Sequence, residues 1–231
     1  MKYTLALMMS LGFYTTYSQQ VIDVNNTNYN ALNMLQVVGG NPVTNAKYVS
    51  LVEGSPYLQE EWIKGKLVTE QGYVFQDVFL RLNLIENTIH YKDPKGNEMI
   101  ATMPIREVIL PEQATSKTLR FVNSNILPSS KKGWYLLLHN ANVSFFKFYE
   151  KVLTENKPYN SATTEQRIRT NEKYFVMMKN VSHSVKNIKN LQALFIDKQK
   201  DIETFINTLD IKKPLEERMI EIVAYYNTLS K

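Results

Sequence analysis

The stretch that most constrains the fold is residues 54–110, where short apolar and polar alternations are separated by polar turns. In residues 78–84, Val, Leu, Leu and Leu alternate with Phe, Arg and Asn, a period of two that is typical of a strand with one buried face. The turn at residues 93–97 (DPKGN) combines a proline that presets φ with residues that tolerate positive φ. Short strands joined by such turns predict antiparallel pairing in a curved sheet, sandwich-like or a partly closed barrel.

The same pattern extends on both sides of this stretch, so we expect a β-rich domain over residues 46–180. Strands are predicted at residues 47–52, 118–122, 134–139 and 174–178, and a polar loop at residues 157–171. Residues 143–153 (VSFFKFYEKVL) fit either a helix or a strand, and their aromatic density favours the strand. Together these segments predict a meander of roughly eight to ten strands.

The pattern changes to a helical one in residues 185–231. A first helix is expected behind Asn187 as N-cap, and a second behind Asp197. Pro214 suits the first position of a third helix, whose apolar face comprises Leu215, Met219, Ile222, Val223, Tyr226 and Leu229. The predicted fold class is therefore α+β: a curved antiparallel β-sheet with two to three C-terminal helices packed on it.

The N-terminus reads as a secretory signal peptide over residues 1–18. Lys2 precedes an apolar run at residues 3–14, and small residues, Thr16 and Ser18, precede a cut before Gln19. The alternatives are a retained anchor or a buried helix, but the run is too short to span a bilayer. We expect an exported protein, in the periplasm, associated with the outer membrane or extracellular, with an Asn- and Gln-rich leader at residues 19–45.

The residue types and motifs indicate no catalytic, metal or cofactor site. The chain has no cysteine, which excludes disulfides, thiolate zinc sites, a cysteine nucleophile and a lipidated cysteine. Its three histidines, His90, His139 and His183, lack ligand spacing, and no nucleophile elbow, zinc-protease or phosphate-loop motif occurs. We therefore favour a non-enzymatic protein that binds a partner or ligand. A hydrolase of envelope or extracellular polymers, with a catalytic group that no motif reveals, is the alternative.

Two sets of residues are candidates for binding. The first is aromatic and can line a ligand groove by stacking on sugars or apolar ligands, although core packing explains these residues equally well: Tyr57, Trp62, Trp134 and Tyr135. The second belongs to the basic second half, since residues 19–130 hold 9 basic and 11 acidic residues while residues 131–231 hold 17 and 11. It is a candidate surface for an anionic partner, although the charges of a solvated face explain it more simply: Arg167, Arg169, Lys173, Lys179, Lys186 and Lys189.

These candidate surfaces suggest three kinds of partner: an envelope protein, a glycan or an anionic membrane surface. Export argues against nucleic acid. A third functional hypothesis follows from the basic half, namely a membrane-surface adaptor.

Several features together resemble a known group of sequences. They are the predicted signal followed by Gln19, the entry Gly54-Ser55-Pro56-Tyr57-Leu58 with Trp62, the strand pair around Gly72 and residues 78–84, and the tail LFIDKQKDIETFINTLDIKKPLEERMIEIVAYYNTL. In this order they resemble uncharacterised secreted proteins of the Bacteroidota, over most of residues 50–230. The resemblance implies export across the inner membrane and supplies no activity or site residue.

Overall fold

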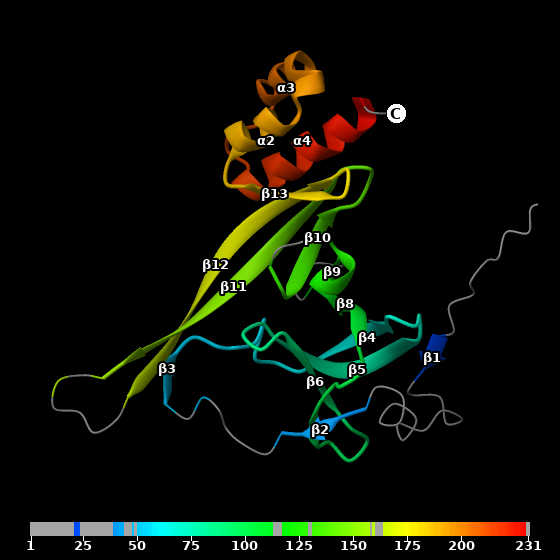
Figure 1. Cartoon of the computed structure of the whole chain (residues 1–231), viewed down its shortest axis with the longest axis vertical. Coiled ribbons are helices and arrows are strands. Elements are labelled where there is room, and N and C mark those ends of the chain that lie inside the picture. Colours follow the sequence, from blue (N-terminus) through cyan, green and yellow to red (C-terminus); the bar gives the residue numbers. More distant parts are fainter. Residues whose placement is uncertain are drawn as a thin grey trace, which may run out of the picture.

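The computed structural model describes residues 21–23, 39–43, 48, 50–112, 117–128, 131–157, 159 and 164–229. The predicted signal peptide and most of the leader lie outside the described residues. One large, open, curved sheet dominates the molecule, and three helices cover one end of it (Figure 1). The predicted α+β class is confirmed.

The sheet has 13 strands, more than the eight to ten expected, because the short strands β1, β2 and β13 add to the predicted meander. Its order is β13-β12-β11-β10-β9-β8-β4-β5-β6-β7-β2, with β1 parallel to β5 and β3 parallel to β12. The bounds are β1 Val21–Asp23, β2 Asn41–Pro42, β3 Leu51–Glu53, β4 Ile63–Thr69, β5 Val74–Asn83, β6 Thr88–Lys92, β7 Glu98–Ile100, β8 Ile105–Pro111, β9 Thr118–Asn123, β10 Trp134–His139, β11 Ser144–Asn156, β12 Glu165–Met178 and β13 Val181–Val185.

The alternation in β5 is as predicted: Val78, Leu80 and Leu82 are buried, while Phe79 is exposed. A bulge interrupts this pattern opposite β4, where Asp77 adopts a φ of 56°. The buried face of β5 joins β4, β6 and β8 to β10 in the larger hydrophobic core, which comprises Ile63, Leu67, Phe75, Val78, Leu80, Leu82, Leu84, Ile89, Tyr91, Met99, Ile105, Val108, Leu110, Phe121, Trp134 and Leu136.

Strands β11 and β12 form one long hairpin that continues beyond the body of the sheet as an arm, on which the short β3 pairs with β12 (Figure 1). The prediction of a strand at residues 143–153 is confirmed, because β11 runs through this segment. The prediction of a loop over residues 157–171 is wrong from Glu165 onward, where β12 begins. Strand β13 was not predicted either, because its exposed, serine-rich sequence buries only Val185 fully.

The helices are α2 Ile188–Leu194, α3 Gln199–Ile206 and α4 Leu215–Leu229, with short 3-10 turns at Ser124–Ile126 and Ile196–Lys198. Asn187 caps α2 as predicted, accepting a hydrogen bond from Asn190 N at 2.9 Å. The predicted Asp197 cap is wrong: Lys198 holds that position without a side-chain bond, and Asp197 instead accepts a hydrogen bond from Tyr226. The helices pack on β10 to β13 through a second core of Val143, Phe145, Val176, Val185, Leu191, Phe195, Ile202, Met219, Ile222, Val223 and Tyr226.

Candidate functional site

A group of polar and aromatic residues lies on the face of β5, β6 and β7 opposite the larger core. Arg81 and His90 are direct cross-strand neighbours. Glu98 lies opposite Lys92 at the start of β7, so its side chain is diagonal to His90 on the same face. The segment before β4 crosses this face and brings in Tyr57 and Trp62. We call these five residues the outer-face cluster: Tyr57, Trp62, Arg81, His90 and Glu98.

The segment that carries Tyr57 is held to β5 by its backbone. Leu58 N donates to Leu82 O, and Leu84 N donates to Pro56 O, both at 2.8 Å. The backbone N–H of Tyr57 also donates to the hydroxyl of Ser55 at 3.1 Å. The Gly-Ser-Pro-Tyr entry seen in the sequence thus acts as a short strap that fixes the Tyr57 ring over the sheet.

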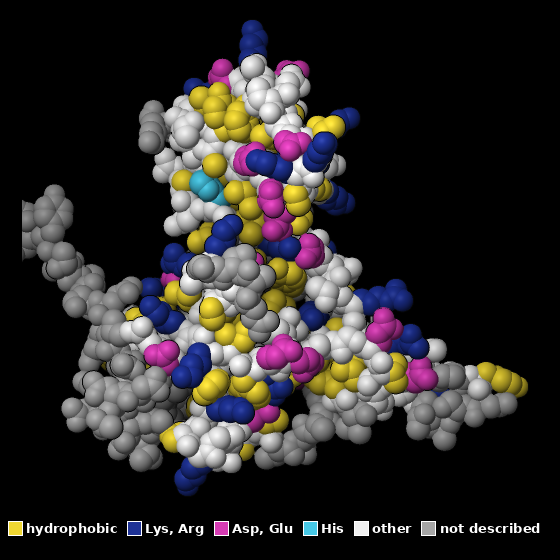
Figure 2. All heavy atoms as spheres, turned by 180° about the vertical axis from the view of Figure 1, so that it is seen from behind, with side chains coloured by type: hydrophobic (Ala, Val, Ile, Leu, Met, Phe, Trp, Pro, Cys, Tyr) yellow, Lys and Arg dark blue, Asp and Glu magenta, His cyan; other side chains and the backbone are white. Residues whose placement is uncertain are grey.

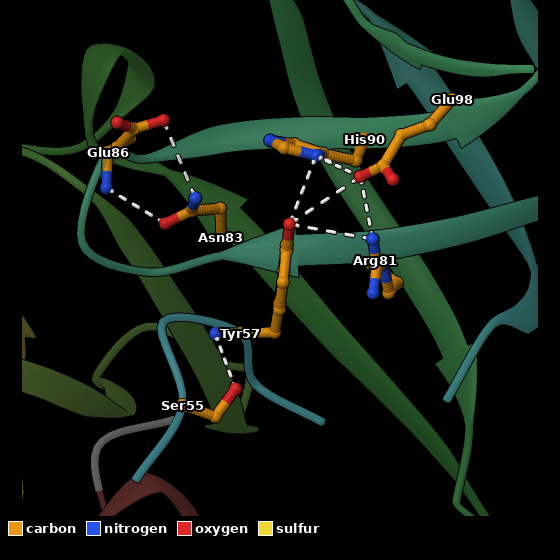
Figure 3. A network of polar contacts seen from close by, with 7 residues as sticks. All are labelled: Ser55, Tyr57, Arg81, Asn83, Glu86, His90 and Glu98. Atoms are coloured by element: carbon orange, nitrogen blue, oxygen red, sulfur yellow. Dashed lines mark hydrogen bonds and ion pairs between the residues drawn. The ribbon is translucent and has the colours of Figure 1, made fainter. Parts of the chain in front are cut away.

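Glu98 is the centre of the hydrogen bonds in the outer-face cluster (Figure 3). Its Oε1 lies 2.6 Å from Arg81 Nη2 and 2.6 Å from His90 Nδ1, and the Tyr57 hydroxyl donates to it at 3.5 Å. The Tyr57 and His90 rings pack edge to face with centroids 5.3 Å apart. These contacts make one connected ion-pair network, which fixes the position of each member.

The electrostatics of the cluster keep Tyr57 neutral and Glu98 charged. Burial raises the pKa of Tyr57 to about 12, although the neighbouring Arg81 cation opposes this shift. For Glu98, burial acts to raise the pKa, but hydrogen bonds from His90 and Arg81 outweigh it and lower the pKa below its ordinary value.

His90 is 3% exposed, and its Nε2 is buried without a hydrogen-bond partner among the described residues. Of three hollows lined wholly by described residues, His90 lines none.

Cations and aromatic rings alternate around the cluster. The Arg81 guanidinium lies over the rings of Tyr57, at 4.1 Å, and of Trp62, at 4.3 Å. Lys92 Nζ lies 5.0 Å from the Trp62 ring, and Lys64 Nζ lies 5.4 Å from the ring of Phe79, a residue that is 43% exposed. We call five members of this set the aromatic-cation surface: Trp62, Phe79, Lys64, Arg81 and Lys92.

The structure separates the four aromatic residues that the sequence singled out. Tyr57 and Trp62 meet on either side of Arg81. Trp134 and Tyr135 are 2% and 0% exposed and lie in two different core clusters. Trp134 Nε1 donates to Asn87 O at 3.2 Å, and Tyr135 Oη donates to Lys131 O at 3.1 Å. These two residues therefore pack the sheet and do not line the surface formed by the first two.

The six predicted anion-binding residues also fall into two groups: Arg167, Arg169 and Lys173 lie on β12, whereas Lys179, Lys186 and Lys189 follow its end at Met178. Fourteen strand residues span roughly 45 Å. On the arm, Arg167 pairs with Glu53 at 3.0 Å and Glu165 at 3.3 Å, Lys173 pairs with Glu150, and Arg169 is exposed.

At the helical end, Lys179, Lys186 and Lys189 are exposed and form no ion pair with any described residue. On the side seen in Figure 2, basic and acidic side chains are interspersed and form no continuous basic band. The six residues therefore make two separate basic surfaces.

A second buried polar group was not anticipated. Lys147 is 8% exposed and lies between Glu172 Oε1, at 2.9 Å, and Glu216 Oε2, at 2.8 Å. The Tyr174 hydroxyl donates to the same Glu216 oxygen at 2.9 Å. This group joins the sheet to α4, so it is a structural connection between the two halves. Its only sign in the sequence is a lysine inside a dense aromatic run.

The described residues contain no group of three or more His, Cys, Asp or Glu side chains that could hold a metal ion. No helix in the described part of the chain is long and apolar enough to cross a membrane. No protein family, curated protein or solved structure matches the chain.

Proposed function

We propose that this chain is an exported, non-enzymatic protein that binds a ligand on the aromatic-cation surface. One observation carries the proposal: the stack of Tyr57, Arg81 and Trp62, with Lys92 beside it, is fixed by Glu98 on an otherwise regular strand face. Such fixed rings and cations lose little conformational freedom when a ligand binds. The signal-like residues 1–18 support export to the periplasm, the outer membrane or the exterior.

The chemistry of this surface suits a ligand that has both ring faces and negative charge. Exposed aromatic rings stack on sugar rings, and ammonium groups next to them attract carboxylate or sulfate groups. An acidic glycan of the envelope or its surroundings combines these two properties. We therefore propose an acidic glycan as the ligand class.

The proposal is tested by measuring binding of the purified chain to an immobilised acidic polysaccharide and to its neutral counterpart. We expect binding to the acidic polymer to weaken with added salt, because the lysines are exposed. Trp62→Ala and Phe79→Ala should each reduce affinity about fivefold to tenfold. Tyr73→Ala is the matched control, because Tyr73 is a similarly exposed ring, at 37%, outside this surface. Equal binding by all three variants would contradict the proposal.

One observation favours the alternative hydrolase. The 2.6 Å contact between His90 Nδ1 and Glu98 matches a general base oriented by a carboxylate, and catalysis would require a movement that opens the buried Nε2 to the substrate. Incubating the same polysaccharides with the chain and analysing the products separates the two functions. Turnover that His90→Gln abolishes and Trp62→Ala retains would favour the enzyme. Binding without turnover would favour the binding protein.

The helical end favours the second alternative, a membrane-surface adaptor. Lys179, Lys186 and Lys189 are exposed there without an ion pair among the described residues, and Lys189 shares a hollow with Ile196, which is 76% exposed. Cations around an exposed apolar side chain suit an anionic lipid surface. The adaptor requires that vesicle binding rises with anionic lipid content and falls with salt. Binding that responds to neither would exclude it.

A further inference from the structure

The arm formed by β11 and β12 has one covered edge and one open edge. The two strands pair continuously from Ser144 opposite Met177 to Asn156 opposite Glu165. Strand β3 pairs with β12 on the arm, whereas β10 pairs with β11 only as far as Phe148. No described strand therefore pairs with the outer edge of β11 over residues 149–156. In Figure 1 the arm extends away from the body of the molecule, while at its base Tyr149, Glu150 and Lys151 line a hollow together with Leu84 and Lys131 of the body.

The backbone of this edge is directed outward at alternate residues. Gln166 N donates to Ser50 O at 2.9 Å, so its backbone points away from β11. Glu155, the cross-strand partner of Gln166, therefore forms a non-hydrogen-bonded pair with it. The N–H and C=O of Glu155 then point away from β12, towards the open edge. By alternation, Lys151 and Leu153 present their N–H and C=O to the same open edge. A row of unpaired groups is a template for another strand.

The charges along this edge are self-complementary. Lys151 and Glu155 lie on one face of β11, two positions on either side of Leu153. Lys151 is half-buried and forms no ion pair within 4.0 Å among the described residues. Burial lowers the pKa of its ammonium group, and the Glu60 carboxylate only partly offsets this. Glu155 accepts a hydrogen bond from Gln166 Nε2 at 2.9 Å. Neither Lys151 nor Glu155 forms an ion pair with a described residue, so each lacks an oppositely charged partner in the part of the chain that the structure describes.

We propose that the open edge of β11 pairs antiparallel with the same edge of a second copy, about a twofold axis through Leu153. This register places Lys151 of each copy opposite Glu155 of the other, and Leu153 opposite its own counterpart. Lys151, Leu153 and Glu155 all direct their backbone N–H and C=O towards the open edge. In this register, each of the three cross-copy pairs is therefore a hydrogen-bonded pair. Registers centred on Lys151 or Glu155 would instead place like charges opposite each other.

The proposed dimer is small, because it joins only the arms. A few strand residues bury less area than a standard stable interface, so association should depend on concentration over the micromolar range. It uses none of the residues of the aromatic-cation surface, and it stands or falls independently of the proposed ligand.

Charge exchange on the edge tests the register. Sedimentation velocity over a range of concentrations should show a monomer–dimer equilibrium for the unaltered chain. Lys151→Glu and Glu155→Lys should each weaken the dimer about tenfold or more, because each creates two like-charge pairs. The double variant K151E/E155K should restore the dimer. Arg169→Glu, on β12 of the same arm, is the matched control and should leave it unchanged. A monomer at all concentrations, or no rescue in the double variant, would overturn the proposal.

A cysteine scan gives an independent test, because the natural chain has no cysteine. A cysteine placed at Leu153 meets its own counterpart at a Cα separation of about 5.5 Å, within disulfide range. A cysteine placed at Thr154 faces residue 152 of the other copy and is roughly 8 Å from its own counterpart. Under mild oxidation, Leu153→Cys should form a covalent dimer quickly and Thr154→Cys slowly. Equal rates would overturn the register even if a dimer forms. Far-UV circular dichroism of each variant verifies that the sheet is intact.

Discussion

Replacing Lys147 with Met tests whether the buried ion-pair group holds the helices to the sheet. The side chain of Lys147 is 10% exposed, and its two partners come from β12 and α4. Burial opposes the charge of Lys147, but hydrogen bonds to Glu216 and Glu172 raise its pKa above its ordinary value. Methionine keeps the length and apolar character of the side chain and removes the charge. The variant therefore isolates the electrostatic connection.

The expected loss follows from the exposure of the two carboxylates. The side chain of Glu216 is 30% exposed, so its pair lies near the lower end of about 1.5–3 kcal/mol for buried charged hydrogen bonds. The side chain of Glu172 is 47% exposed, so solvent screening reduces its pair to about 0.5 kcal/mol. We expect the free energy of unfolding to fall by about 2 kcal/mol in total. With a urea dependence of about 2–3 kcal/mol per molar, the midpoint falls by about 0.7–1 M.

Urea unfolding followed by far-UV circular dichroism measures this shift, because the signal reports the sheet and the helices together. Lys173→Met is the matched control: this lysine pairs with Glu150, its side chain is 36% exposed, and it should cost less than about 1 kcal/mol. If Lys147→Met is as stable as the unaltered chain, or more so, the reasoning is refuted. Apolar packing would then outweigh the ion pairs, as it does in some proteins with buried charges.

Three further changes test local features. Asn187→Ala removes the cap bond from Asn190 N and should lower the unfolding free energy by about 1 kcal/mol in thermal melts. Asn227→Ala leaves the N–H and C=O of Val143 without the bonds that they form at 2.9 and 2.8 Å; it should cost about 2 kcal/mol and speed amide exchange there. Because the pKa of Glu98 is lowered by folding, its contribution is complete above the ordinary glutamate pKa and is lost as the pH falls through the folded value. The stability difference between Glu98→Gln and the unaltered chain should therefore be constant near neutral pH and disappear in acid.

The parts of the fold that alternate between core and solvent could be predicted from the sequence. Strand β5 and the apolar face of α4 each bury one side, and burial selects the period of their hydrophobic residues. The start of β12 could not be predicted in this way. Residues 165–170 bury only Ile168, and none of the three core clusters includes a residue of this segment. Backbone hydrogen bonds to β11 hold this segment in a strand. Such bonds do not require a regular alternation of hydrophobic residues, so the sequence shows none.

The outer-face cluster was only half predictable. Tyr57 and Trp62 are conspicuous as aromatic residues in a polar entry segment, but nothing in that segment identifies Arg81 as the cation between them. His90 and Glu98 could have been paired from the turn at residues 93–97. A hairpin closed by Lys92 and Glu98 puts His90 diagonal to Glu98 on one face, which is the observed register. A strand pairing inferred from a turn therefore carries more information about a site than residue types alone.

The two proposed binding surfaces depend on one property of this sheet. Its core lies on one face of β5 and β6, so the opposite face is free to carry fixed rings and charges without disturbing packing. Its hairpin extends past β10, so an edge remains open at the arm. In a closed barrel, the edge strands would pair with each other, and no strand would be free to join a second copy. The open sheet thus separates the surface proposed for a ligand from the edge proposed for a second copy of the chain, so that binding at one need not obstruct the other.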